Sequence, residues 1–266
     1  MKKLCVTELL GPRQLERSSG VRSQEILRFM NKLLEKASQN EVVDLGAELA
    51  KLTNNVTCRM VMSTTCSEED GEAEKCRELV KESFELAAKL CFGEVLGPLK
   101  SLGFWLYGKQ AMNLTNRYDE LFERILKEHE NSGSREAWKN EQVDLVDVLL
   151  HVYQDEKVEV KITKTQIKAF LLELDNMDRD QCESTVQNFG FVPFGGGRKG
   201  CPGTMVAYNL IYTVIAAMVQ CFDWEVKGQV AEAKVNVEAG SGMSMGMAHP
   251  LLCLLVVYFN PLTAKR

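Results

Sequence analysis

Apolar residues recur at intervals of three and four along most of the first 175 positions, which is the spacing of an amphipathic helix. In the first such stretch the residues that share one side are Ile26, Leu27, Met30, Leu33 and Leu34. The acidic run at 67–72 is interpreted as a solvated face. It directly precedes the next amphipathic stretch, and carboxylates are favoured at a helix N-terminus. The pattern predicts helices over 21–37, 45–62, from the acidic run to about 90, and over 110–130, 145–153 and 165–174.

The pattern of polar and apolar residues changes after residue 175. Residues 175–188 are polar and show no period, whereas 204–222 is apolar on nearly every side, which predicts a helix buried in the protein. Short strand candidates follow at 223–226 and 251–259. The fold class predicted by this order is mostly α with a small β portion.

Composition narrows the function classes. The chain has 266 residues, of which 45% are hydrophobic and 26% charged, so a folded globular protein is expected. A net charge of −5, with basic and acidic residues interleaved, argues against a nucleic-acid partner. Neither a signal peptide nor a run of ~20 apolar residues is visible, so a soluble or peripherally attached chain is expected.

Cysteine and histidine spacing gives little support for a zinc site or a disulfide framework. The nine cysteines form no CxxC pair, and each except Cys201 is expected to behave as a small, buried or half-buried apolar residue. The three histidines, His129, His151 and His249, lie far apart and are expected to be solvated or to cap helices.

A glycine-rich loop at 191–203, FVPFGGGRKGCPG, is the strongest candidate site. One interpretation is a dinucleotide site, because Gly195, Gly197 and Gly200 match GxGxxG before a helix; against it, no β-branched strand precedes the loop, and a proline interrupts that segment. A second is a plain glycine turn that ends in a proline at the first helical position, although such a turn does not need several glycines around a lone thiol.

The third interpretation is a flat cofactor whose metal is bound by Cys201. Just before a helix, free backbone N–H groups and the helix dipole stabilise the thiolate that ligates a metal. Glycines let the backbone lie against a porphyrin face, Arg198 and Lys199 can meet its propionates, and Phe194 can shield the sulfur.

The loop resembles the haem-binding loop of the cytochrome P450 monooxygenases, whose pattern is F-x-x-G-x-R-x-C-x-G. Phe194, Gly197, Cys201 and Gly203 fall on fixed positions, while Lys199 stands where the family usually has arginine. The stretches at 2–10, 166–172 and 247–251 are similar to the plant flavonoid-oxidising branch, which includes flavone synthase II and the pterocarpan 6a-hydroxylases.

The resemblance implies a haem cofactor (heme, iron protoporphyrin IX) with Cys201 as the iron ligand and Phe194, Gly197, Arg198, Lys199 and Gly203 around it. It implies oxidation of a small phenolic substrate with molecular oxygen, and electrons from NADPH through cytochrome P450 reductase at the cytosolic face of the endoplasmic reticulum membrane. It also implies a partial monooxygenase fold in three parts: a helical block at 1–175, a junction at 176–188 that replaces a missing segment, and the cysteine loop, buried helix and strands at 189–266.

The chain also departs from the family. It begins at a position that resembles the middle of the third major helix, so the membrane anchor is expected to be absent and the chain to be cytosolic or unstable as written. After Asp175 the sequence reads Asn176-Met177-Asp178, without the acid-alcohol pair that delivers protons to bound oxygen, so no catalytic residue is assigned.

The family's ExxR pair is expected near the cysteine loop, but the two ExxR strings, Glu25–Arg28 and Glu74–Arg77, lie far upstream and are interpreted as chance matches on solvated faces. The family's later proline-arginine segment is missing as well. Two hypotheses follow: a haem-thiolate monooxygenase, or an inactive remnant of one that was truncated and internally deleted.

Overall fold

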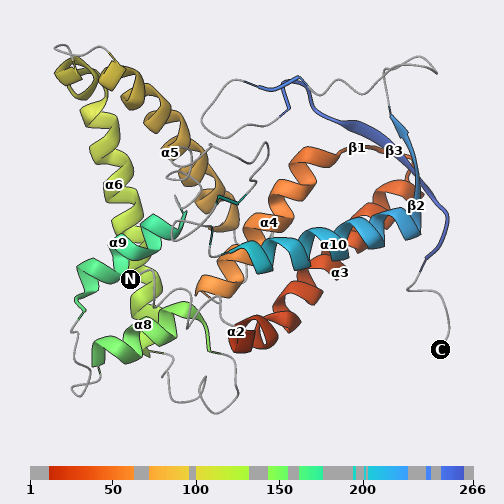
Figure 1. Ribbon diagram of the computed structural model, residues 1–266, viewed down its shortest axis with the longest axis horizontal. Coiled ribbons are helices and arrows are strands. Elements are labelled where there is room, and N and C mark those ends of the chain that lie inside the picture. The colour runs from red at the N-terminus through yellow and green to blue at the C-terminus, as the bar shows by residue number, and fades with distance from the viewer. Residues whose placement is uncertain are drawn as a thin grey trace. The chain divides into compact units, whose positions relative to one another are not determined.

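The structure is a computed structural model of the whole chain. It describes residues 12–62, 72–95, 100–131, 143–154, 162–175, 194–195, 201, 203–226, 238–240 and 247–260. Among these residues helices predominate over strands, as the sequence predicts (Figure 1). The chain divides into two compact units, residues 1–18 with 59–207 and residues 19–58 with 208–266.

Helices form the first unit. α2 (Pro12–Arg17) is followed, beyond α4, by α5 (Glu72–Val95), α6 (Lys100–Asn131), α8 (Leu145–Gln154) and α9 (Lys164–Asp175). α5 and α6 lie side by side as a long pair (Figure 1). Their apolar faces meet α8 and α9 in one core, which explains the helical spacing of apolar residues in this part of the sequence.

Ion pairs between α6 and α9 hold these two helices together beside the core. Lys168 Nζ lies 2.8 Å from Asp119 Oδ1 and 2.7 Å from Glu123 Oε2, and Lys164 Nζ lies 2.7 Å from Glu130 Oε1. The two lysines are four residues apart, so both reach the same helix from one side of α9.

The second unit combines helices with a small antiparallel sheet. α3 (Ser19–Ser38) leads through β1 (Val42–Asp44) into α4 (Leu45–Met62), and α10 (Thr204–Cys221) leads directly into β2 (Phe222–Val226). β3 (Leu252–Val257) is the central strand, in the order β1-β3-β2. Val43 pairs with Cys253 and Trp224 with Leu255, so strands far apart in sequence share one sheet.

Most predicted elements are confirmed with small shifts of their ends. α4 has the predicted bounds, whereas α6 begins ten residues earlier than predicted and β1 was not predicted at all. Phe222, which the sequence assigned to the apolar helix, begins β2 instead. Leu27 was expected on the buried side of α3 but is 49% exposed.

The expectation that the apolar helix is buried is wrong. In α10 only Leu210, Val214, Met218 and Cys221 are buried, whereas α8 buries each of its first six residues. By length and composition alone α10 could cross a membrane, although one such helix is weak evidence of a membrane span. Apolar composition predicts that a helix needs cover, and it does not supply the neighbours that would provide it.

Candidate functional site

The described part of the glycine-rich loop consists of Phe194, Gly195, Cys201 and Gly203. The backbone N–H of Cys201 donates to the carbonyl oxygen of Phe194 at 2.8 Å, so the loop is closed at its base. Gly195 has a φ of 67°, in the left-handed region that a residue with a side chain adopts only at a cost. A glycine here therefore lets the chain turn between Phe194 and the cysteine.

Cys201 stands at the entrance to α10. The hydroxyl of Thr204 donates to the carbonyl oxygen of Cys201 at 2.7 Å, and the N–H of Ala207 donates to the carbonyl of Gly203 at 3.0 Å, which is the first turn of the helix. Cys201 is a half-buried thiol outside any disulfide, whereas Cys58, Cys221 and Cys253 are buried. The prediction that other cysteines serve as small apolar residues is confirmed for these three.

The described atoms fit a haem. A thiol is a soft ligand suited to haem iron, and Cys201 is accessible enough to meet one. A Cβ added to Gly203 would lie 3.7 Å from Cys201 Sγ, an ordinary contact distance, so Gly203 lies directly beside the sulfur. Gly197, Arg198 and Lys199, the other predicted contacts, lie outside the described residues.

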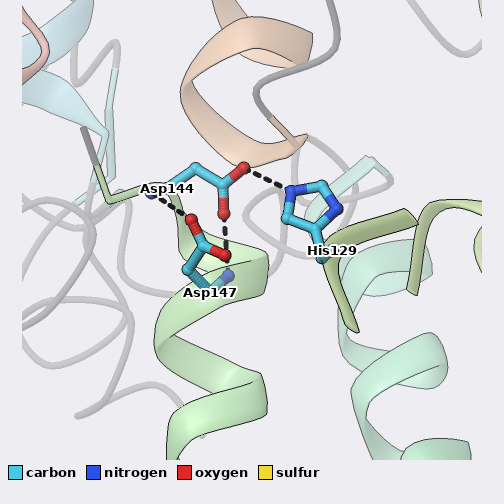
Figure 2. Close-up of side chains that lie close together, drawn as sticks. All are labelled: His129, Asp144 and Asp147. Atoms are coloured by element: carbon cyan, nitrogen blue, oxygen red, sulfur yellow. Dashed lines mark hydrogen bonds and ion pairs between the residues drawn. The ribbon is translucent and has the colours of Figure 1, made fainter. Parts of the chain in front are cut away.

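A second cluster, which the sequence did not predict, joins α6 to α8 (Figure 2). His129, near the end of α6, has Nε2 2.8 Å from Asp144 Oδ2 and Nδ1 2.8 Å from the carbonyl oxygen of Ile125. Asp144 Oδ1 accepts the N–H of Asp147 at 2.8 Å, and Asp147 Oδ2 faces the N–H of Asp144 at 3.4 Å. The two aspartates thus cap the N-terminus of α8 reciprocally.

The geometry of the cluster determines the protonation of His129 and Asp147. Both ring nitrogens of His129 face acceptors, so the ring satisfies both only as the doubly protonated cation. Burial alone lowers the pKa of His129, but the hydrogen bond and charge of Asp144 outweigh burial and raise the pKa to about 9. Burial, helped by the charge of Asp144, raises the pKa of Asp147 to about 6.

One donor atom from each of these three residues lies within 4.8 Å of the other two, a spacing that a divalent cation can bridge. The hydrogen bonds already satisfy His129 and Asp144, so a buried ion pair at a helix cap accounts for the cluster. Of the two expectations for His129, solvated or capping, the first is wrong, because its side chain is 13% exposed and paired with a carboxylate. The sequence signal that could have revealed the cap is the Asp-x-x-Asp spacing before an apolar run.

One ExxR string also differs from its expected setting. Glu25 was placed on a solvated face, but its side chain is 1% exposed, and its Oε1 accepts from Arg28 Nη1 at 2.9 Å. Asn55 Nδ2 lies 3.5 Å from Oε2 of the same carboxylate. The hydrogen bond from Asn55 therefore links α4 to Glu25 on α3, far in sequence from the cysteine loop. The side chains of Glu74 and Arg77 lie outside the described residues.

Comparison with known proteins identifies the family. The cytochrome P450 family model matches this chain in two segments, residues 1–176 and 174–248. The chain therefore belongs to the cytochrome P450 family, and its cofactor is haem. The mostly helical architecture with a small sheet agrees with a partial fold of this family.

Relatives in plants support the same assignment. Cytochrome P450 705A5 of Arabidopsis thaliana is 30% identical over 95% of this chain and 71% of the relative. The 3,9-dihydroxypterocarpan 6A-monooxygenase of Glycine max is 25% identical over 98% of this chain and 74% of the relative. A solved zebrafish cytochrome P450 with progesterone shares the fold, with a TM-score of 0.61 and 15% identity over 91% of this chain and 79% of that one.

The alignments also reveal an internal gap. Against cytochrome P450 705A20 of Arabidopsis thaliana the whole chain is aligned over 379 positions, whereas the chain has 266 residues, a difference of 113 positions. The two family-model segments meet at residues 174–176. Relatives therefore carry a long stretch for which this chain has no counterpart.

Proposed function

We propose that this chain is a haem-thiolate protein of the monooxygenase type in which Cys201 binds the iron. The observation that carries the proposal is the half-buried thiol at the entrance to α10, closed by the hydrogen bond from Cys201 to Phe194. The family's haem motif falls on the same residues. When bound, the haem supplies the iron at which molecular oxygen is activated.

The residues of this chain would hold and orient that group. Cys201 would supply the thiolate that binds the iron, and Gly203 lies beside its sulfur. Phe194 would shield the sulfur, Gly197 would let the backbone approach the ligand closely, and Arg198 and Lys199 would pair with the carboxylates of the ligand.

The substrate class we propose is a flavonoid-type phenol. Support comes from the soybean relative that bears the name of a pterocarpan monooxygenase, at 25% identity. Electrons would come from NADPH through cytochrome P450 reductase at the endoplasmic reticulum membrane, as in the family. Residues 176–188 are proposed to be the junction where the segment present in relatives is replaced.

The second candidate is that this polypeptide binds haem without turning over substrate. The observation that favours it is the sequence after Asp175, where neither Asp175 nor Asp178 is followed by serine or threonine. Proton delivery by a positioned group contributes roughly 10²–10⁴-fold to such reactions. With reductase and NADPH, the chain is expected to give no product from flavanones, isoflavones or pterocarpans, and product above a haem-only control would overturn this candidate.

The spectrum of the chain reconstituted with haem tests the main proposal. A thiolate ligand gives the reduced carbonyl complex a red-shifted Soret band, and Cys201→Ser is expected to abolish it. Cys201→His, which offers another iron ligand, should keep haem bound without the red shift, and Cys221→Ala serves as the matched control because that cysteine is buried elsewhere. A red-shifted band that survives in Cys201→Ser, or that no preparation shows, would refute the assignment.

A further inference from the structure

Five apolar side chains of α10 follow one another at intervals of three, four, three and four residues. They are Met205, Tyr208, Tyr212, Ile215 and Val219, called the α10 stripe below. Four are exposed, Met205 by 58%, Tyr212 by 64%, Ile215 by 53% and Val219 by 70%, and Tyr208 stacks on Tyr212 with ring centroids 5.5 Å apart. No described residue of the second unit, residues 19–58 with 208–266, covers Tyr212, Ile215 or Val219.

The α10 stripe lies on the opposite side of the helix from the residues that anchor it. At about 100° per residue, Leu210, Val214 and Met218 share the buried side, and the centre of Tyr212, Ile215 and Val219 lies roughly 130° around the helix from it. Asn209, Thr213 and Gln220 border the stripe along one edge with uncharged polar groups. An apolar centre with a polar border is the anatomy of a protein interface.

We propose that the α10 stripe is a self-association surface on which a second copy of this chain docks its own α10. A three-four spacing of apolar residues is the seam by which two helices pack side by side. α10 contains no charged residue, so pairing two copies brings no like charges together. The same stripe thus fits itself.

The length of α10 limits the size of this contact. A helix of 18 residues is only about 27 Å long, so the contact belongs to the class below ~1,200 Å² in total. A reversible dimer of modest affinity is therefore expected.

A bilayer fits the stripe less well. The helix passes at Cys221 directly into β2, which is paired with β3 from Phe222 to Val226, so crossing a membrane would require the sheet to follow. Its length of about 27 Å falls short of the ~30 Å hydrocarbon core. Amide side chains along one edge would also lack partners there.

The internal gap is consistent with a stripe that the described residues of the second unit leave uncovered. Relatives carry 113 further positions in the alignment that spans all of this chain, and the interruption stands between α9 and α10 in sequence. This chain has no such segment to lay on α10. A second copy brings an apolar surface of the matching kind.

Sedimentation velocity of the full chain over roughly 1–200 µM tests the proposal, because this range spans weak dimer affinities. The wild type is expected to show a reversible monomer–dimer equilibrium. Ile215→Glu, which places a charge in the contact, should raise the dissociation constant of the dimer at least ~10-fold while leaving the far-UV circular dichroism unchanged. Leu27→Glu on α3, a residue 49% exposed and off the stripe, is the matched control and should change affinity less than ~3-fold.

Each contrary result has a distinct meaning. A monomer at every concentration overturns the proposal, as does a dimer that is indifferent to Ile215→Glu or equally sensitive to Leu27→Glu. Flotation of a monomeric chain with phosphatidylcholine vesicles that Ile215→Glu abolishes would assign the stripe to a membrane instead. The haem spectrum is a separate readout, so failure here leaves the assignment of Cys201 untouched.

Discussion

α8 and α10 are both apolar helices, but α8 is largely buried and α10 is largely exposed. α8 buries its first six residues, with Val146, Leu149 and Leu150 fully enclosed, whereas the α10 stripe is open. α8 has α6 and α9 beside it in the same core. The comparison shows that an apolar helix is stabilised by burial, but that its own sequence does not determine whether other segments pack against it.

The two helices also begin differently. Asp144 and Asp147 cap α8, and His129 ties that cap to α6 through a buried ion pair. α10 begins after a loop held by the hydrogen bond from Cys201 to Phe194 and by Thr204. One start is fixed by charge and burial, the other by local backbone geometry.

Truncation of one side chain on each helix should give the largest contrast. Leu149→Ala removes a side chain that is 0% exposed, so the free energy of unfolding is expected to fall by about 2–5 kcal/mol, because a cavity remains. Ile215→Ala removes a side chain that is 53% exposed, and the change is expected to stay within about 0.5 kcal/mol.

Urea denaturation followed by circular dichroism measures both variants, at a concentration low enough to keep the chain monomeric. If Ile215→Ala destabilises as much as Leu149→Ala, something covers α10 in solution and the comparison fails. Equal, small effects would instead mean that the α8 core is loosely packed.

The pH dependence of stability probes the charged cap of α8. The folded pKa of His129, about 9, lies above its ordinary 6.5, so its contribution is complete below pH 6.5 and is lost as pH rises through 9. Discounted for partial exposure, this loss is expected to be about 2 kcal/mol. His129→Gln should flatten the curve between pH 6.5 and 9.

Protonation of Asp147 affects stability at lower pH, and here too stability falls as pH rises. Its folded pKa, about 6, lies above its ordinary 3.8, so the folded state holds the proton more firmly and stability gains as pH falls from 6 toward 3.8. Asp147→Asn should remove this lower part alone. Asp144→Asn keeps a capping side chain but loses the charge, and an unchanged upper part in that variant would refute the ion pair.

The spacing of apolar residues predicted most of the helices, because each amphipathic helix repeats apolar residues every three or four positions along its own segment. The bounds of α4 and the presence of α8, α9 and β2 could be predicted from apolar spacing alone. β1 could not, because three residues are too short for a period and its partner, β3, lies about 200 residues away. The partners of His129 and Glu25 also come from distant helices or tight caps, which periodicity does not encode.

The smallest effect expected concerns the loop that precedes α10. Gly195 has a φ of 67°, so Gly195→Ala forces a side chain into the left-handed region and should lower the free energy of unfolding by roughly 1–2 kcal/mol. Gly20→Ala is the matched control: it lies in α3, nothing described lies within 4 Å of the added Cβ, and helix propensity predicts a gain of up to ~1 kcal/mol. Thermal and urea unfolding of both variants measure the two signs, and haem titration of Gly195→Ala measures the link to Cys201. If Gly195→Ala is as stable as the wild type and binds haem equally well, the positive φ is not required, and the start of α10 is set by Thr204 and Gly203 rather than by the turn before Cys201.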